Sequence, residues 1–399
     1  MTTTTQKIPS GYKQTEIGVI PADWDVEPIK QLATITTGSK NTQDRISDGL
    51  YPFFVRSQTI ERINSYSYDG EAILTAGDGV GTGKVFHYIN GKFDIHQRVY
   101  KISDFNKKLN GYFFFLYFSN YFFNRIMQMT AKSSVDSVRM EMIADMQIPI
   151  PSETEQSAIA TALIEADTLI KKLEKLIEKK KNIKQGVMQE LLTGKRRLPG
   201  FSGKWEMKKL GEVAEFERGR DLPKSDMSDE GAYKCIHYGQ LFREYQELVG
   251  EIKSKTNSNT GRFYSKSNDV LMPTSDVTPS GLATASCIKE NGIILGGGIL
   301  VIRFNAGYDG LYFSYFVSQN KTVILKLVKG STVFHLYASD LANLEINFPG
   351  PDEQKAIASV LSDMDTEIEK LESQLTKYQN IKQGMMQTLL TGKIRLLTK

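Results

Sequence analysis

Apolar residues recur at alternating steps of four and three along two stretches of the chain, residues 151–198 and 349–399. This 3.5-residue period is typical of coiled coils, whereas a single helix on a globular core follows a period of 3.6. The pattern therefore predicts two long helices that pair with each other, with two core helices of a single domain as the alternative. The positions expected in the helix pair are Ile159, Leu163, Ile170, Leu173 and Ile177 in the first stretch, and Ile357, Leu361, Met364, Ile368, Leu371 and Leu375 in the second.

Both predicted helices carry start and stop signals. Ser152 and Glu155 form a capping-box pattern at the first start, and Pro351 suits the first turn of the second helix. Gly194 and Gly392 follow the last apolar residues, where a left-handed glycine commonly ends a helix. About 40 residues at roughly 1.5 Å each predict rods of about 60 Å.

The two stretches are copies of each other. Residues 182–198 and 380–396 agree at fourteen of seventeen positions, at a constant offset of 198 residues. Trp24 and Trp205 begin a second, looser correspondence at an offset of 181 residues. The chain is therefore an internal duplication in which the segments between tryptophan and helix differ in length.

Those intervening segments predict two mixed, strand-rich domains. Short β-branched runs alternate with glycine, asparagine and aspartate turns, and each segment contains an aromatic helix candidate, at residues 110–117 and 309–316. We expect an α+β fold with an internal repeat: an N-terminal arm at 1–23, a domain at 24–150, a helix at 151–198, a domain at 199–348 and a helix at 349–399. Similar scaffolds with different loops indicate similar tasks with different specificities.

Composition and charge narrow the class of protein only a little. A net charge of +4 permits a nucleic-acid partner without requiring one. Cys235 and Cys287 lack metal-ligand spacing and are expected to be reduced thiols in a cytoplasmic protein. The N-terminus has no apolar signal, and the most apolar run, residues 112–123, is too short to span a bilayer, so no membrane association is expected.

One glycine-rich segment, residues 77–84, has a partial likeness to a phosphate-binding loop. Asp78 stands where a Walker A motif has its first glycine, and Val85 replaces the Ser or Thr that would bind magnesium. A nucleoside-triphosphate site is therefore not expected there. A hairpin that contacts a nucleic-acid backbone and a plain tight turn remain as alternatives.

No other pattern predicts catalysis. The acidic run at 351–355 coincides with a helix start, where its carboxylates act as caps, rather than with separate strands around a metal. The four histidines have no metal or Ser/His spacing, and no Rossmann fingerprint or Pro-Pro methyltransferase motif is present. We expect no catalytic residue, no metal site and no cofactor in this chain.

Basic and polar residues beside aromatic ones in the domain loops suit DNA recognition better. Arginine and glutamine make bidentate contacts to guanine and adenine edges, while Ser, Thr and Lys suit phosphates. For each residue an ordinary solvated loop side chain is the alternative. The candidates are Arg56, Gln58, Lys84, Gln97, Arg98, Ser133 and Arg139 in the first domain, and Arg218, Arg220, Tyr238, Gln240, Arg243, Thr274, Ser275 and Thr332 in the second.

The chain resembles the specificity (S) subunit of Type I restriction-modification enzymes over essentially its whole length. The resemblance rests on Tyr-Lys-Gln-Thr-Glu-Ile-Gly at 12–18, Leu-Pro-Gly-Phe-Ser-Gly-Lys-Trp at 198–205, Glu-Gln-x-x-Ile at 155–159 and 353–357, and the repeated Lys-Gln-Gly…Leu-Leu-Thr-Gly-Lys helix ends. It implies two target-recognition domains separated by two antiparallel coiled-coil helices in a pseudo-twofold arrangement, each domain reading one half of a bipartite DNA sequence.

The same resemblance implies the partners. Double-stranded DNA would be bound together with two modification (methyltransferase) subunits, which carry S-adenosylmethionine and methylate a flipped adenine. Restriction/translocase subunits would add ATP- and Mg-dependent cleavage. A coiled-coil scaffold with two protein-binding domains is the alternative function.

Overall fold

The computed structural model describes residues 8–129, 137–259 and 261–396. The chain divides into two compact units, Met1–Glu174 with Gln374–Lys399 and Lys175–Ser373. Each unit contains strands and helices, so the α+β class expected from the sequence is confirmed. None of the described helices has the length and apolarity needed to cross a membrane.

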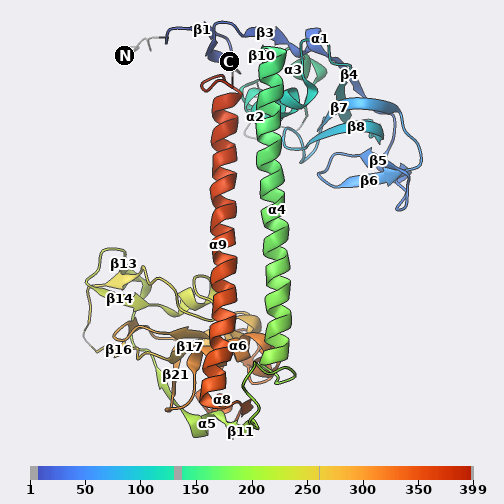
Figure 1. The fold of residues 1–399 in the computed structure, drawn as a ribbon. Coiled ribbons are helices and arrows are strands. Elements are labelled where there is room, and N and C mark those ends of the chain that lie inside the picture. The colour runs from blue at the N-terminus through green and yellow to red at the C-terminus, as the bar shows by residue number, and fades with distance from the viewer. Residues whose placement is uncertain (1–7, 130–136, 260, 397–399) are drawn as a thin grey trace. The chain divides into compact units, whose positions relative to one another are not determined.

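The two predicted long helices are α4 (Glu153–Leu191) and α9 (Pro351–Leu389), each 39 residues long (Figure 1). Gly194 and Gly392 follow them with left-handed φ angles of +71° and +68°, which end the helices where the sequence placed the stops. Among the pairing positions, Met364, Leu371 and Leu375 are partly buried. The others are buried: Ile159, Leu163, Ile170, Leu173, Ile177, Ile357, Leu361 and Ile368.

The first unit combines the start of α4 with the end of α9. Lys382 pairs with Asp167, and Arg395 pairs with Glu155. Arg395 comes thirteen residues after Lys382, whereas Glu155 comes twelve residues before Asp167. This opposite order means that the two helix segments run antiparallel. Their apolar faces join one core, to which α4 contributes Ile159, Ala160 and Leu163, and to which Leu389 at the end of α9 and the next residue, Leu390, also belong.

The second unit repeats this arrangement with the helices exchanged. Lys184, near the end of α4, pairs with Asp365, and Arg197 pairs with Glu353 near the start of α9. Each of these residues lies 198 positions from its counterpart in the first unit. Each unit is therefore built from both halves of the chain, which is the structural form of the sequence duplication.

The first unit contains a six-stranded sheet against which α2 (Gly111–Met129) lies (Figure 1). Its strand order is β4 (Thr34–Thr37), β9 (Val99–Ser103), β7 (Tyr68–Ala76), β8 (Phe86–Ile95), β5 (Tyr51–Phe54) and β6 (Ile60–Ile63). Phe113, Phe114 and Phe118 of α2 are fully buried in the core behind this sheet. Smaller elements complete the unit: β1 (Tyr12–Thr15) with β2 (Gly18–Pro21), β3 (Asp25–Pro28) with β10 (Gln147–Ile150), α1 (Ile29–Leu32), η1 (Thr42–Asp44) and α3 (Met140–Ala144).

The second unit distributes its strands over several sheets. A four-stranded sheet has the order β12 (Ala214–Arg218), β21 (Ile299–Phe304), β17 (Asp269–Pro273) and β19 (Ser286–Ile288), and a five-stranded one has β13 (Met227–Ser228), β15 (Lys255–Thr256), β14 (Tyr233–Ile236), β20 (Ile294–Leu295) and β16 (Phe263–Tyr264). The remaining strands are β18 (Ser275–Asp276), β23 (Phe334–His335) and β22 (Lys329–Gly330) in one sheet, and β11 (Glu206–Lys209) with β24 (Glu345–Phe348) in another. The shorter helices are α5 (Leu210–Val213), η2 (Lys224–Asp226), η3 (Tyr238–Phe242), η4 (Pro279–Ala283), α6 (Gly310–Gln319), α7 (Lys321–Leu325) and α8 (Ala338–Ala342).

The two domains share one strand scaffold. β7 pairs with β9, placing Ile73 opposite Ile102, and β17 pairs with β21, placing Val270 opposite Ile302. Next to them a parallel pair recurs, β5 with β8 and β14 with β20. This common register fixes which residues of the two domains are equivalent, even where the loops share no sequence.

Candidate nucleic-acid interface

The glycine-rich loop of the first unit, residues 77–85, is a compact series of turns. The Thr82 amide donates to the Gly79 carbonyl at 3.0 Å, and the Val85 amide donates to the Gly81 carbonyl at 2.9 Å. Because these amides are used within the loop, they are not free to surround a phosphate group. The loop is thus closed by its own backbone hydrogen bonds.

Asp78 in this loop binds two of the predicted DNA-contacting arginines. Its carboxylate accepts a hydrogen bond of 2.7 Å from Arg56 and a second one from Arg98. Burial raises the pKa of Asp78, but these two hydrogen bonds outweigh burial and hold the pKa below its ordinary value. Asp78 therefore stays ionised and fixes both guanidinium groups beside the loop, with part of each exposed to solvent.

Three further candidates lie around the same loop. Gln58 donates to the carbonyl of Lys84 at 3.2 Å, and the Lys84 ammonium lies 5.7 Å from the ring centre of Phe123. Gln97, next to Arg98 in the chain, donates to the side chain of Asn41 at 2.6 Å. Five residues selected from separate stretches of sequence are thus gathered into one exposed surface: Arg56, Gln58, Lys84, Gln97 and Arg98.

The two remaining candidates of the first domain have different outcomes. Val138 donates its amide to the Gly77 carbonyl at 2.7 Å, so exposed Arg139, the next residue, also lies near the loop. Ser133 lies outside the described residues.

In the second unit the corresponding loop follows β17. Thr274 donates both its amide and its hydroxyl to the carbonyl of Gly298, at 2.9 and 3.2 Å. Ser275 pairs with His335 in a short antiparallel ladder. Both candidate side chains are partly exposed at this edge of the domain.

The η3 segment borders this loop and contains three candidates. Tyr238 is half-exposed, and its ring lies against Gly298, the residue that binds Thr274. Arg243, the residue just after η3, is exposed and caps the end of that helix. Gln240 is buried: its oxygen accepts the His237 amide at 2.9 Å, while its nitrogen donates within the domain. Gln240 therefore shapes the loop from inside and presents no free group to a base.

The last three candidates lie at strand ends and in a turn. Arg218 and Arg220 are exposed on either side of Gly219, whose amide donates to the carbonyl of Ile299 at 2.9 Å. Thr332 is exposed in the turn between β22 and β23, and β23 pairs with the β18 loop strand. In both units, then, candidates gather at the edge where β7 or β17 ends. The sequence did not single out the apolar residues at this edge, because exposure is not visible in a residue pattern.

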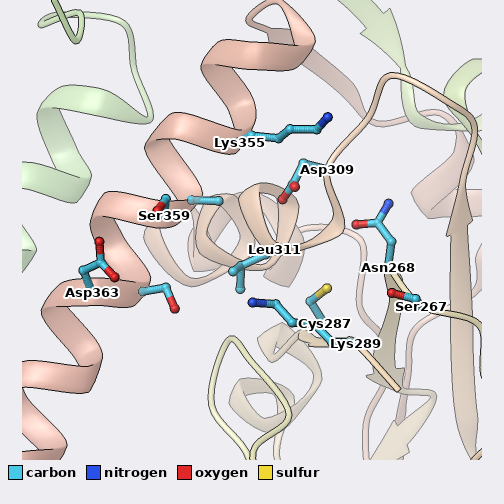
Figure 2. Close-up of a pocket in the computed structure, with 11 residues that line it drawn as sticks. Ser267, Asn268, Cys287, Lys289, Asp309, Leu311, Lys355, Ser359 and Asp363 are labelled. Carbon is cyan, nitrogen blue, oxygen red and sulfur yellow. The ribbon is translucent and has the colours of Figure 1, made fainter. Parts of the chain in front are cut away.

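A cavity of about 420 Å³ lies within the second unit, between the first turns of α9 and the strand domain (Figure 2). Figure 2 shows Lys355 and Asp363 along α9, and Cys287 and Asp309 on the strand domain beside it. Asp309 accepts the Tyr312 amide at 2.8 Å and caps α6. Burial raises the pKa of Cys287 to about 12, so its thiol remains protonated and is not a nucleophile at neutral pH.

Among the described residues, no group of three His, Cys, Asp or Glu side chains could hold a metal ion. The two cysteines are free thiols, and both are buried. The loop edges present arginine and lysine cations together with hydroxyl groups, and these are groups that suit a large anionic partner.

Comparison with known proteins gives consistent matches. The sequence profile of the family described as Type I restriction modification DNA specificity domain matches residues 21–185 and 202–378. A putative type I restriction enzyme MjaX specificity subunit of Methanocaldococcus jannaschii is 29% identical over 427 residues and covers 97% of both chains. The MjaVIII specificity subunit of the same organism is 24% identical and covers 94% of both chains.

The fold is also similar to solved structures. The S subunit of a Type-I restriction-modification system from M. genitalium matches with a TM-score of 0.63 and 16% identity, over 92% of this chain and 96% of that chain. A structure described as concerning complex assembly and conformational transition of the type I R-M system matches with a TM-score of 0.53 and 13% identity, over 94% of this chain and 99% of that chain. At these identities the likeness concerns the fold alone.

Proposed function

Because the chain belongs to the Type I restriction modification DNA specificity family, we propose that it is the DNA-recognition subunit of a restriction-modification complex. Each of its two domains reads one half of a bipartite target. The observation that carries this proposal is the shared strand scaffold with different loop side chains at equivalent positions.

Equivalent positions illustrate the difference in specificity. Phe54 and Ile236 pair in the same way with the parallel strand beside them, so Arg56 and Tyr238, two residues further on, are equivalent. Arginine suits a guanine edge, whereas tyrosine contacts bases through its ring and a single hydroxyl. The same backbone therefore presents different chemistry in the two domains, as a protein that reads two unlike half-sites requires.

The chain itself supplies recognition and no catalysis. Modification subunits bind it and flip the target adenine into their own S-adenosylmethionine site, and restriction subunits add ATP- and Mg-dependent translocation and cleavage. This division of labour is supported by family membership.

The test is sequencing of methylated bases in DNA from cells that carry this chain with its modification subunit, compared with cells lacking this chain. We expect a methyladenine motif in two parts with a fixed gap. Exchanging residues 24–150 for the matching domain of another family member should change one half of the motif and leave the other half and the gap unchanged.

The reciprocal exchange of residues 205–348 is the matched control and should change only the other half. A change in both halves from either exchange would contradict the assignment of one half-site to each domain. Unchanged methylation, with both proteins expressed, would favour the coiled-coil scaffold instead.

A further inference from the structure

The two most exposed large apolar side chains among the described residues are valines, Val80 at 99% and Val277 at 72%. Isolated apolar residues are common on protein surfaces, so exposure alone carries little meaning. These two valines also occupy corresponding positions in the two domains. Each lies near the tip of the loop that follows an interior strand of its own sheet, β7 in the first unit and β17 in the second.

The two valines are structurally equivalent. Ile73 pairs with Ile102 as Val270 pairs with Ile302, and each valine comes seven residues after the first member of its pair. Over the four residues that follow the strands, the loops read Gly-Asp-Gly-Val and Thr-Ser-Asp-Val. Valine is the one identity in otherwise different loop tips.

The backbone anchors both loops in the same way. The Gly77 amide donates to the carbonyl of Arg98 at 2.8 Å, and the Thr274 amide donates to that of Gly298 at 2.9 Å. The carbonyls of Gly77 and Thr274 each accept an amide from the segment that closes their domain, at 2.7 and 3.0 Å. Because these bonds are made by the backbone, the positions of the valines do not depend on the valine side chains.

Local side chains hold the tips further and define their surroundings. Asp78, two residues before Val80, binds Arg56 and Arg98, so the tip emerges beside two guanidinium groups. Asp276 accepts the Val277 amide and the Thr278 hydroxyl, both at 2.7 Å. Val80 is thus an apolar group beside two cations, and Val277 is one beside a hydroxyl and a carboxylate that are bonded within the loop. Both suit the major groove, where the thymine methyl is an apolar spot among polar base edges.

We propose that Val80 and Val277 each contact the C5-methyl group of one thymine, Val80 in the half-site read by the first domain and Val277 in the half-site read by the second. This inference rests on the proposed DNA-recognition function. To that function, the inference adds one residue in each loop that contacts an apolar group of the target DNA. A valine is short and β-branched, so it suits contact with a methyl group at a base edge better than insertion between base pairs, for which longer side chains are used.

The experiment uses the full chain assembled with its modification subunits, and duplexes carrying the motif found by methylation sequencing. Each thymine of the motif is replaced in turn by deoxyuridine, which lacks only the methyl group, and the Kd is measured by fluorescence anisotropy. We expect one thymine per half-site at which this change weakens wild-type binding by about fourfold, the equivalent of one buried methyl group at about 0.8 kcal/mol.

The variants Val80→Ala and Val277→Ala assign each contact. Val80→Ala should lose sensitivity to deoxyuridine at the thymine of its own half-site and keep sensitivity in the other half, and Val277→Ala should show the reverse. Each variant is thus the control for the other. Leu50→Ala removes a comparably exposed side chain, 69% exposed at the start of β5, and should keep both sensitivities.

The other outcomes overturn the inference. If Val80→Ala and Val277→Ala keep the wild-type response at every thymine, the valines do not contact thymine methyl groups although the recognition function stands. If both variants reduce methylation equally at all sites without altering either deoxyuridine response, the valines bind a protein partner instead. If the wild-type complex itself yields no motif, the proposed function fails and the inference with it.

Discussion

At the scale of single residues, two arginines after the long helices each neutralise a buried carboxylate. Arg395 binds Glu155 through two hydrogen bonds of 2.6 and 2.7 Å, and Arg197 binds Glu353 in the same two-bond manner. The two glutamate side chains are only 1% and 2% exposed. Replacing either arginine by methionine leaves a buried charge without its ionic partner, so we expect the free energy of unfolding of that unit to fall by about 3–5 kcal/mol.

The two tryptophans of the chain allow this prediction to be measured one unit at a time, because Trp24 belongs to the first unit and Trp205 to the second. In a Trp205→Phe background, Arg395→Met should lower the urea midpoint reported by Trp24 fluorescence. In a Trp24→Phe background, Arg395→Met should leave the Trp205 midpoint unchanged, and Arg197→Met should give the opposite pattern. Equal loss in both units from one variant would show that the arginines do not act locally.

For the candidate nucleic-acid interface, the residue pattern identified several of the side chains but not the groups that they contact. Arg56, Lys84 and Arg98 were selected as separate loop residues, and only the fold brings them around one loop, because sequence separation does not determine distance. Gln240 was selected for its bidentate amide, yet the fold buries it as the internal support of η3. Composition indicates what a side chain is able to bind, whereas burial decides whether it is available.

At the scale of elements, one face of α4 holds the helix to the first unit. Leu163 is fully buried in the core shared with Leu389 of α9, while its neighbour Ile164 is 41% exposed. Leu163→Ala removes packed atoms and leaves a cavity, so we expect a loss of about 2–5 kcal/mol. Ile164→Ala is the matched control and should cost less than about 1 kcal/mol. Trp24 fluorescence during urea unfolding measures both, and similar losses would mean that the buried face is not the one described.

Long elements could be predicted from the sequence, whereas very short ones could not. The heptad pattern at 159–177 and 357–375, together with the start and stop signals, predicted α4 and α9 clearly. The aromatic stretches predicted at 110–117 and 309–316 form helices at Gly111–Met129 and Gly310–Gln319. Strands of two residues, such as β13 and β18, carry no readable alternation. They form because neighbouring strands and loops satisfy their backbone groups, which is information that a local pattern does not contain.

At the scale of the whole molecule, the first unit requires both ends of the chain. Residues 374–399 belong to it, and Leu389 and Leu390 are 4% and 0% exposed in its core. The duplication alone did not predict this exchange, because Glu155 and Arg197 also lie within one repeat. In the structure Glu155 is neutralised by Arg395, which comes from the other repeat.

A chain that ends at residue 373 should therefore lose the first unit and keep the second, although the residues removed are the most distant in sequence from the first domain. The deletion removes the apolar partners of Leu163 and leaves Glu155 buried without Arg395. We expect the cooperative urea transition of Trp24 to disappear or to move to a much lower midpoint, while that of Trp205 is preserved. A chain that ends at residue 396 is the matched control, since it retains Arg395 and both buried leucines, and it should keep both transitions. If the Trp24 transition survives the larger deletion, the first domain folds without the far repeat, and the exchanged helix ends serve to connect the units and not to stabilise them.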